Sequence, residues 1–168
     1  MTLAELNTLP PAAFVAALGG IFEHSPWVAE RALATRPFAT AEALHATMVA
    51  AVAAAGEDAQ LALLRAHPEL AGRAMIRSEL TADSSQEQAG AGLTQCSPDE
   101  YARLQDLNAR YIARFGFPFI VAVRGLDRAQ ILERFAARIA NDRVTEFREA
   151  LSQVARIARF RLDSLLAA

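Results

Sequence analysis

The sequence predicts an all-α fold: a single-domain bundle of about eight to nine helices over residues 1–168, with no significant sheet. Three observations support this. Much of the 53% hydrophobic content is alanine, the strongest helix former, whereas aromatic residues make up only 7%. Helix-capping residues and glycine stops recur along almost the whole chain. A single segment has the composition of a strand, and a lone strand cannot pair its own backbone.

Proline, glycine and capping residues bound each helix expected in the first part of the chain. These helices are expected at 11–18, 26–36, 41–55 and 57–66. The first begins at a pair of prolines and ends at a pair of glycines, and Ser25 caps the second. The second must end before Pro37, because the residue before a proline is pushed out of the α region. Thr40 caps the third, Gly56 supplies its left-handed end, and the step from His67 to Pro68 halts the fourth.

Capping boxes mark the helices expected later in the chain. In this motif a serine and a glutamate three residues on bond each other's backbone N–H groups, as the spacing of Ser84 with Glu87 and of Ser97 with Glu100 allows. Asp127 is of a residue type that commonly caps helices, and we expect it to begin a further helix. The expected helices lie at 85–91, 98–115, 128–140 and 144–166, with a weaker helix at 71–80 and a loop at 81–85.

The segment FPFIVAV at 117–123 has strand composition but no partner run elsewhere. We therefore expect an extended or helical segment packed among helices. As core it is unremarkable. As the wall of a site it would offer unpaired backbone N–H and C=O groups beside apolar side chains, which is what a small polar heterocycle with amide-like edges needs.

Charge and hydropathy exclude several classes of partner. The net charge is −2 with no long run of one sign, so nucleic acid and anionic membranes are not expected partners. The longest apolar stretch, residues 46–55, is about half a membrane span. The N-terminus has an early acid and no basic region before an apolar core, so we expect no signal peptide. The expected protein is soluble and cytoplasmic.

Residues that are missing limit the chemistry. All 17 basic residues are arginine, so the chain can form no lysine Schiff base, pyridoxal phosphate aldimine or P-loop lysine contact. Cys96 is the sole cysteine, which excludes an internal disulfide and a multi-cysteine zinc site, and a lone thiol of this kind is typically inert. His67 and Glu69 lie close in sequence, but other metal ligands are scattered. We expect no metal and no cofactor.

Three histidines are candidates for acid–base chemistry. His24 precedes a serine–proline turn, which favours a turn role, and His45 lies within the alanine-rich helix, which favours a structural or exposed one. His67 stands where Pro68 ends a helix, so its ring projects from an element that is rigid on one side and open on the other. A histidine at a helix C-terminus also simply favours the helix dipole, and both interpretations stay open at this point.

The run Ser84-Ser85-Gln86-Glu87-Gln88 is the second candidate site, and two interpretations of it are open. Ser84 and Glu87 fit a capping box. Alternatively, the two glutamine amides beside a carboxylate, at a helix N-terminus that favours anions, form part of a binding site. The sequence QAGAGL that follows would let backbones approach closely, although no strand precedes it as a dinucleotide fingerprint would require.

Four segments in order resemble one family. HSPWVAERALATRPF (24–38), LLRAHPELAGRA (63–74), SSQEQAGAGL (84–93) and LNARYIARFGFPFIVAVRG (107–125), with the closing RIARFRLDSLL, are similar to the OHCU decarboxylases. OHCU is 2-oxo-4-hydroxy-4-carboxy-5-ureidoimidazoline, the second intermediate after urate oxidation. Each motif alone is weak, but the four together are specific and cover nearly the whole chain. One departure is HPE, where many relatives have HPD.

The resemblance implies an all-helical, cofactor-free and often dimeric enzyme that converts OHCU to (S)-allantoin and CO2. It implies that His67 transfers the proton, with Glu87 as a second catalytic group. The substrate contacts that it implies are Pro68, Ser84, Ser85, Gln86, Glu87, Gln88, Phe119, Ile120, Val121, Ala122, Val123 and Arg161. The partners expected are this small ureidoimidazoline and a second copy of the chain, in a homodimer.

Two other classes of function are open from the sequence. A non-catalytic helical module that binds a purine-degradation metabolite would keep the polar pocket and could dispense with His67. A helical interaction protein would use its apolar stripes against a partner, and the polar motifs would then be caps and turns. Binding without turnover would distinguish the binding module from an enzyme. For the interaction protein, no ligand would shift Tm.

Overall fold

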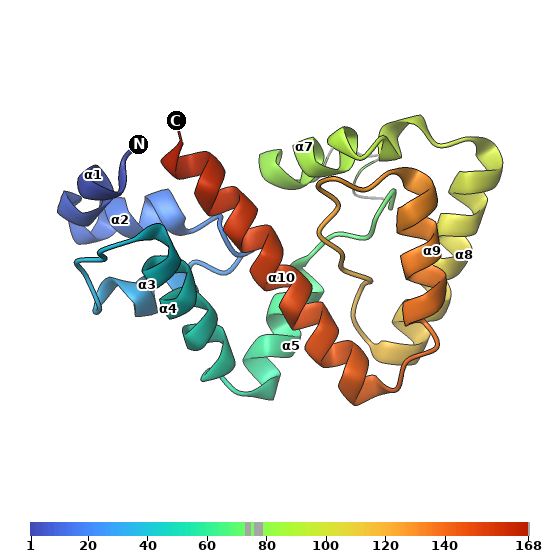
Figure 1. Cartoon of the computed structure of the whole chain (residues 1–168). Coiled ribbons are helices and arrows are strands. Elements are labelled where there is room, and N and C mark those ends of the chain that lie inside the picture. The colour runs from blue at the N-terminus through green and yellow to red at the C-terminus, as the bar shows by residue number, and fades with distance from the viewer. Residues whose placement is uncertain (73–74, 76–78, 168) are drawn as a thin grey trace. The chain divides into compact units, whose positions relative to one another are not determined.

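The computed structural model describes residues 1–72, 75 and 79–167. Its contacts divide the chain into two compact units (Figure 1). Unit 1 comprises Met1–Ala66 and Val154–Ala168, and unit 2 comprises His67–Gln153. The single domain expected over residues 1–168 stays a prediction, and each unit is described by itself.

Within the described residues the chain forms nine α-helices, a short 3-10 helix and no strand, which confirms the predicted all-α fold. The elements are α1 (Leu3–Thr8), α2 (Pro11–Leu18), α3 (Trp27–Leu33), α4 (Ala41–Ala53), α5 (Glu57–Ala66), α7 (Ala82–Gly90), η1 (Leu93–Gln95), α8 (Pro98–Phe115), α9 (Arg128–Arg138) and α10 (Arg143–Leu166). No single helix in this part of the chain is long and apolar enough to cross a membrane.

Unit 1 is built from α1 to α5 and the C-terminal part of α10. Thr40 caps α4 through its side chain, as expected, and Gly56 has the predicted left-handed φ of 84°. Helix α3 begins after Pro26, slightly later than expected, and α1, which a capping box at Thr2 starts, was not predicted. The core of the unit is aliphatic and aromatic, and includes Leu6, Phe14, Leu18, Val28, Leu44, Met48 and Leu162.

Two of the three histidines have local roles in unit 1. The Nε2 atom of His45 donates to the Ala155 carbonyl at 2.8 Å, which assigns it the structural role expected. His24 is exposed and has a φ of 48°, a value that suits a turn and that a histidine tolerates better than a branched residue.

Unit 2 holds an aromatic core around the segment 117–123, which forms neither helix nor strand. Tyr111 of α8 lies 5.4 Å from the Phe119 ring, and Phe135 of α9 stacks on Phe119 at 3.9 Å. Phe147 of α10 meets Phe117 edge-on at 5.9 Å. The segment is therefore enclosed by rings from three helices, each pair adding about 0.5–1.5 kcal/mol beyond the area that it buries.

The start of α7 corrects the sequence analysis. The loop expected at 81–85 is wrong, because α7 begins at Ala82 with Thr81 as its N-cap, whose Oγ1 accepts from the Ser84 N–H at 3.2 Å. Threonine caps a helix nearly as well as serine, and Asp83 in the first turn favours this start. Half of the weaker helix expected at 71–80 lies outside the described residues. By contrast, the capping box at Ser97 and Glu100 and the left-handed Gly116 bound α8 as predicted.

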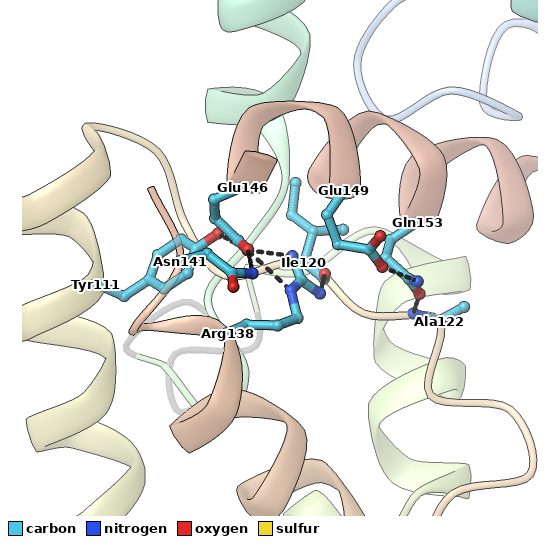
Figure 2. A network of polar contacts seen from close by, with 8 residues as sticks. All are labelled: Tyr111, Ile120, Ala122, Arg138, Asn141, Glu146, Glu149 and Gln153. Carbon is cyan, nitrogen blue, oxygen red and sulfur yellow. Dashed lines mark hydrogen bonds and ion pairs between the residues drawn. The ribbon is translucent and has the colours of Figure 1, made fainter. Parts of the chain in front are cut away.

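A buried carboxylate connects the helices of unit 2 (Figure 2). Glu146 is fully buried, and Arg138 donates to its Oε1 from Nε at 2.8 Å and from Nη2 at 2.5 Å. The Tyr111 hydroxyl donates to the same oxygen, and Asn141 Nδ2 donates to the other at 3.0 Å. Burial and the Glu146 carboxylate raise the pKa of the Tyr111 phenol, so it stays protonated and remains a donor.

Replacing Glu146 tests how much unit 2 depends on this cluster. Glu146→Leu should lower the free energy of unfolding by about 3–5 kcal/mol, since it leaves the Arg138 guanidinium buried without its carboxylate. The measurement is urea denaturation followed by far-UV circular dichroism. Asp106→Ala is the control, because the Asp106–Arg110 pair is more than 60% exposed on both sides and its loss should cost less than about 1 kcal/mol. Equal costs for the two variants would contradict the expectation.

Candidate active site

His67 lies at the first position after α5 and is the first residue of unit 2. It is 7% exposed, so its ring is almost fully enclosed. The helix ends here as the sequence predicts, because Pro68 cannot continue it. Ala71, four residues on, has a left-handed φ of 49°, a conformation that costs a residue with a Cβ about 1–2 kcal/mol. A Cβ on residue 72 would stand 2.7 Å from the Glu69 Cβ, so Gly72 is required for this tight turn.

Three side-chain amides hold the turn that follows His67. Gln88 of α7 accepts from the Ala71 N–H at 2.9 Å and donates to the Glu69 carbonyl at 3.2 Å. From α8, Gln105 donates to the Ala71 carbonyl at 2.8 Å and Asn108 donates to the Leu70 carbonyl at 2.9 Å. These bonds compensate the strain at Ala71 and fix the backbone beside His67. Gln105 and Asn108 were not among the predicted site residues.

The α7 residues predicted to form the site divide between two faces of the helix. Ser84, Glu87 and Gln88 have i, i+3, i+4 spacing and share one face. Ser84 and Gln88 are buried and Glu87 is half-buried, whereas Ser85 and Gln86 are exposed. The capping-box interpretation of Ser84 and Glu87 is wrong, because both lie inside the helix. Neither side chain therefore starts α7, which Thr81 caps.

The segment Phe119–Val123 is buried but only partly paired through its backbone. Arg138 Nη1 donates to the Ile120 carbonyl at 2.6 Å, and the Ala122 N–H donates to Gln153 Oε1 at 2.9 Å. The Val123 carbonyl accepts from the Leu126 N–H in a turn. Among the described residues, nothing pairs with the N–H or C=O of Phe119 or Val121, although these residues are 1% and 4% exposed. More than 90% of buried backbone groups in proteins are paired, so unpaired ones here identify a candidate contact for a polar ligand.

Helix α8 links the turn after His67 to this segment. Asn108 and Tyr111 are three residues apart and lie on the same buried face of α8. Asn108 bonds the Leu70 carbonyl, and the Tyr111 ring contacts Phe119. Gln88 joins α7 to the same turn. Within unit 2 the structure thus connects all three predicted segments, the His67 turn, α7 and 119–123.

Arg161, the remaining predicted residue, belongs to unit 1. Its Nη1 atom donates to Glu23 Oε2 at 2.6 Å and to the Gly20 carbonyl at 3.2 Å. The side chains of Arg161 and Glu23 are 4% and 1% exposed, so this is a buried ion pair. Sequence reasoning missed Glu23, because its partner lies 138 positions away in the chain.

Two other expectations concern reactive side chains. Burial and the nearby Glu100 carboxylate raise the pKa of the Cys96 thiol, which keeps it protonated and supports its interpretation as inert. Among the described residues, no group of three or more His, Cys, Asp or Glu side chains is arranged to hold a metal ion.

The fold and these features define a class: an all-helical protein whose candidate site includes a buried histidine at a helix end and an irregular, partly unpaired backbone segment. The family model for OHCU decarboxylase matches residues 7–163. The chain belongs to the OHCU decarboxylase family.

Similar proteins come from distant organisms. The chain is 44% identical over 162 residues to the 2-oxo-4-hydroxy-4-carboxy-5-ureidoimidazoline decarboxylase of Haloferax volcanii, covering 96% of this chain and 94% of that one. It is 40% identical to the mouse (Mus musculus) protein of the same name, covering 100% and 94%. It is 41% identical to the uric acid degradation bifunctional protein PucL of Bacillus subtilis, covering 98% of this chain but only 33% of that one, so it spans about a third of this longer relative.

Solved structures support the same fold. The crystal structure of (S)-allantoin synthase superimposes with a TM-score of 0.78 at 33% identity, covering 99% of this chain and 54% of that one. A crystal structure of OHCU decarboxylase in the presence of (S)-allantoin gives a TM-score of 0.68, covering 93% and 98%. At 20% identity, this second likeness concerns the fold alone.

Two glutamines of α7 provide a matched test of the turn beside His67. Gln88→Ala should lower the free energy of unfolding by about 1–3 kcal/mol, because it leaves the Ala71 N–H and the Glu69 carbonyl buried without their amide. Gln86→Ala, an exposed site on the same helix, should change it by less than about 0.5 kcal/mol. Urea denaturation measures both. A similar loss at the two positions would show that the amide does not hold the turn.

Proposed function

We propose that this chain decarboxylates OHCU to (S)-allantoin and CO2 in the degradation of urate. The observation that carries the proposal is the connection, within unit 2, of the buried His67 turn to the partly unpaired segment 119–123 through one face of α8. Membership of the OHCU decarboxylase family and the relatives named for this reaction support it.

The substrate contains its own electron sink, so the reaction requires no lysine, pyridoxal or thiamine. The carboxylate of OHCU is attached to a carbon beside a C=N bond. When the C–CO2 bond breaks, its electron pair moves toward the imine nitrogen and CO2 leaves. The protein has to hold that bond perpendicular to the imine plane and to keep the departing carboxylate poorly solvated. The enclosed surroundings of His67 suit the second requirement.

His67 then supplies one proton to one face of the former imine carbon, which carries the ureido group, and this sets the (S) configuration. The hydroxyl on the carbon that lost CO2 becomes a carbonyl, and its proton neutralises the former imine nitrogen. Histidine suits this step as a residue type because its charge changes near neutral pH, and such proton transfer is typically worth about 10²–10⁴-fold in rate. The fixed turn after His67 favours a defined ring position, since a proton donor has to be within hydrogen-bond reach of its acceptor. Pro68 borders the substrate in this proposal.

The remaining groups bind and orient the substrate. The N–H and C=O of Val121 and Phe119 match the donor and acceptor edges of a ureido group, and Ile120, Ala122 and Val123 complete that wall. Ser84 and Glu87, buried and half-buried on one face of α7, would contact the substrate, with Glu87 orienting either the substrate or the His67 ring. Gln88 contributes through the turn that it holds. Ser85 and Gln86 complete the predicted segment.

Arg161 has a less direct role in this scheme. A tight arginine clamp on the substrate carboxylate would stabilise the ground state and slow the loss of CO2. Glu23 already accepts from the Arg161 guanidinium and offsets its charge. Arg161 would therefore attract the substrate carboxylate less strongly than an unpaired arginine would. We further propose a cytoplasmic homodimer, which rests on the family resemblance of the four motifs.

Replacing His67 tests the central step. His67→Ala should lower the rate of (S)-allantoin formation by at least about 10²-fold while the far-UV spectrum stays unchanged. OHCU is generated in situ from urate, and the circular dichroism of the allantoin formed is followed with time. His24→Asn is the control, since His24 is an exposed turn residue and asparagine tolerates its positive φ. Stereospecific turnover by His67→Ala would sink the assignment, and ligand binding by a wild type without turnover would favour a non-catalytic module.

Glu87 and Thr81 separate catalysis from helix capping. Glu87→Gln should reduce kcat and leave Tm unchanged, because α7 is capped by Thr81. Thr81→Ala should do the opposite, lowering the free energy of unfolding by about 1 kcal/mol with little change in kcat. Thermal unfolding and the allantoin assay measure the two effects. A lower Tm with full activity in Glu87→Gln would mean that the carboxylate is structural.

A further inference from the structure

We propose that Arg138 and Gln153 are positioning residues for substrate binding: they take the place of a neighbouring strand along the segment 119–123 and so hold the backbone of Val121 ready for the ligand. The inference rests on the proposed function and deepens it, since it says how a helical fold without a sheet keeps an irregular segment in one conformation.

The bonded positions have the spacing of a strand ladder. The Ile120 carbonyl and the Ala122 N–H are both paired, whereas neither backbone group of the intervening Val121 is paired among the described residues. A strand pairs with one neighbour at alternate residues in the same way. Here the pairing groups are side chains of α9 and α10 rather than another backbone (Figure 2).

Arg138 holds the first of these positions. Its Nη1 atom reaches the Ile120 carbonyl, while Nε and Nη2 engage Glu146, so the guanidinium bridges the segment and a carboxylate fixed by Tyr111. The guanidinium carbon also lies 4.5 Å from the centre of the Phe119 ring. A planar group with donors in a fixed fork can make these contacts at once, which an ammonium cannot.

Gln153 holds the second position, and Glu149 sets the direction of its amide. Gln153 Nε2 donates to Glu149 Oε1 at 2.7 Å. The other end of the same amide, Gln153 Oε1, therefore faces the Ala122 N–H and accepts from it at 2.9 Å. The pair has i, i+4 spacing on α10, and the Gln153 side chain is buried (Figure 2). Because a carboxylate accepts but cannot donate, the reverse orientation of the amide would lose both bonds.

These anchors act on binding rather than on proton transfer. A segment ordered during folding spares the ligand the entropy of ordering it, and the contacts of Val121 are made equally in the ground and transition states. Loss of an anchor should therefore raise KM and leave kcat nearly unchanged. A merely structural residue would lower Tm without this split.

The test uses Gln153, because removing Arg138 would leave the Glu146 carboxylate buried without its charge partner. Gln153→Met keeps the size of the side chain but loses the acceptor, and we expect KM for OHCU to rise about tenfold with kcat within about twofold. Hydrogen exchange of the Ala122 amide should accelerate in the same variant. The single variant Gln153→Glu places two carboxylates together and should also raise KM.

The double variant Glu149→Gln/Gln153→Glu exchanges the amide and the carboxylate. In this variant the carboxylate at position 153 accepts from the Ala122 N–H, and the amide at position 149 donates to that carboxylate. Both hydrogen bonds of the wild type are thus reproduced, so KM should return close to the wild-type value. Asn141→Ala is the matched structural control, since Asn141 bonds Glu146 but not the segment. It should lower Tm and leave KM unchanged.

The outcomes are distinguishable. An unchanged KM in Gln153→Met beside an active wild type overturns the inference and leaves the proposed function standing. A double variant no better than Gln153→Glu overturns it as well, as does an equal rise in KM in Asn141→Ala. A wild-type chain that forms no (S)-allantoin overturns the proposed function, and the inference with it.

Discussion

Backbone that is buried outside helices and strands has to find its hydrogen-bond partners in side chains, and unit 2 is organised around this requirement. Within the described part of unit 2, the turn after His67 and the segment 119–123 are two such stretches. Amides from α7 and α8 pair the first, and a guanidinium and an amide from α9 and α10 pair the second. The helices of unit 2 thus serve both as a core and as a source of polar groups for the chain that they enclose.

The buried Glu146 carboxylate shows what this arrangement costs and how the cost is offset. Removing a carboxylate from water is expensive unless good geometry and several donors compensate for it. Arg138, Tyr111 and Asn141 supply those donors. Since burial and the carboxylate raise the pKa of the Tyr111 phenol, that donor persists when the solution becomes alkaline. The carboxylate in turn fixes Arg138, which reaches the segment.

The sequence predicts what is encoded locally. Thr40, Ser97 and Asp127 cap the helices expected of them, and Pro68 places His67 at a helix end, because each signal acts within a few residues. For lack of a partner strand, segment 117–123 is expected to be extended or helical rather than part of a sheet, and in the structure it forms neither helix nor strand. The start of α7 was missed because two overlapping caps compete there, and the glutamate after Ser84 favoured the wrong one.

The supporting residues could not be predicted in the same way, because their partners lie far along the chain. Arg138 and Gln153 bond backbone that is 18 and 31 positions away, and nothing in their own neighbourhood identifies that target. Asn108 did leave a signal: it lies on the apolar stripe of α8 between Leu104 and Tyr111, where a buried polar side chain needs a partner. The pairing of Arg161 with Glu23 spans almost the whole chain and leaves no local trace.

The side-chain ladder along 119–123 has an evolutionary consequence. A ladder between two strands is made of main-chain atoms, so no single substitution other than proline can delete one of its rungs. In the ladder made by Arg138 and Gln153, each hydrogen bond depends on the identity of one side chain. A single substitution in a helix can therefore remove that bond, shift it or change the charge of its donor or acceptor. Selection can therefore adjust the conformation of segment 119–123 from outside it, without altering any residue of the segment itself.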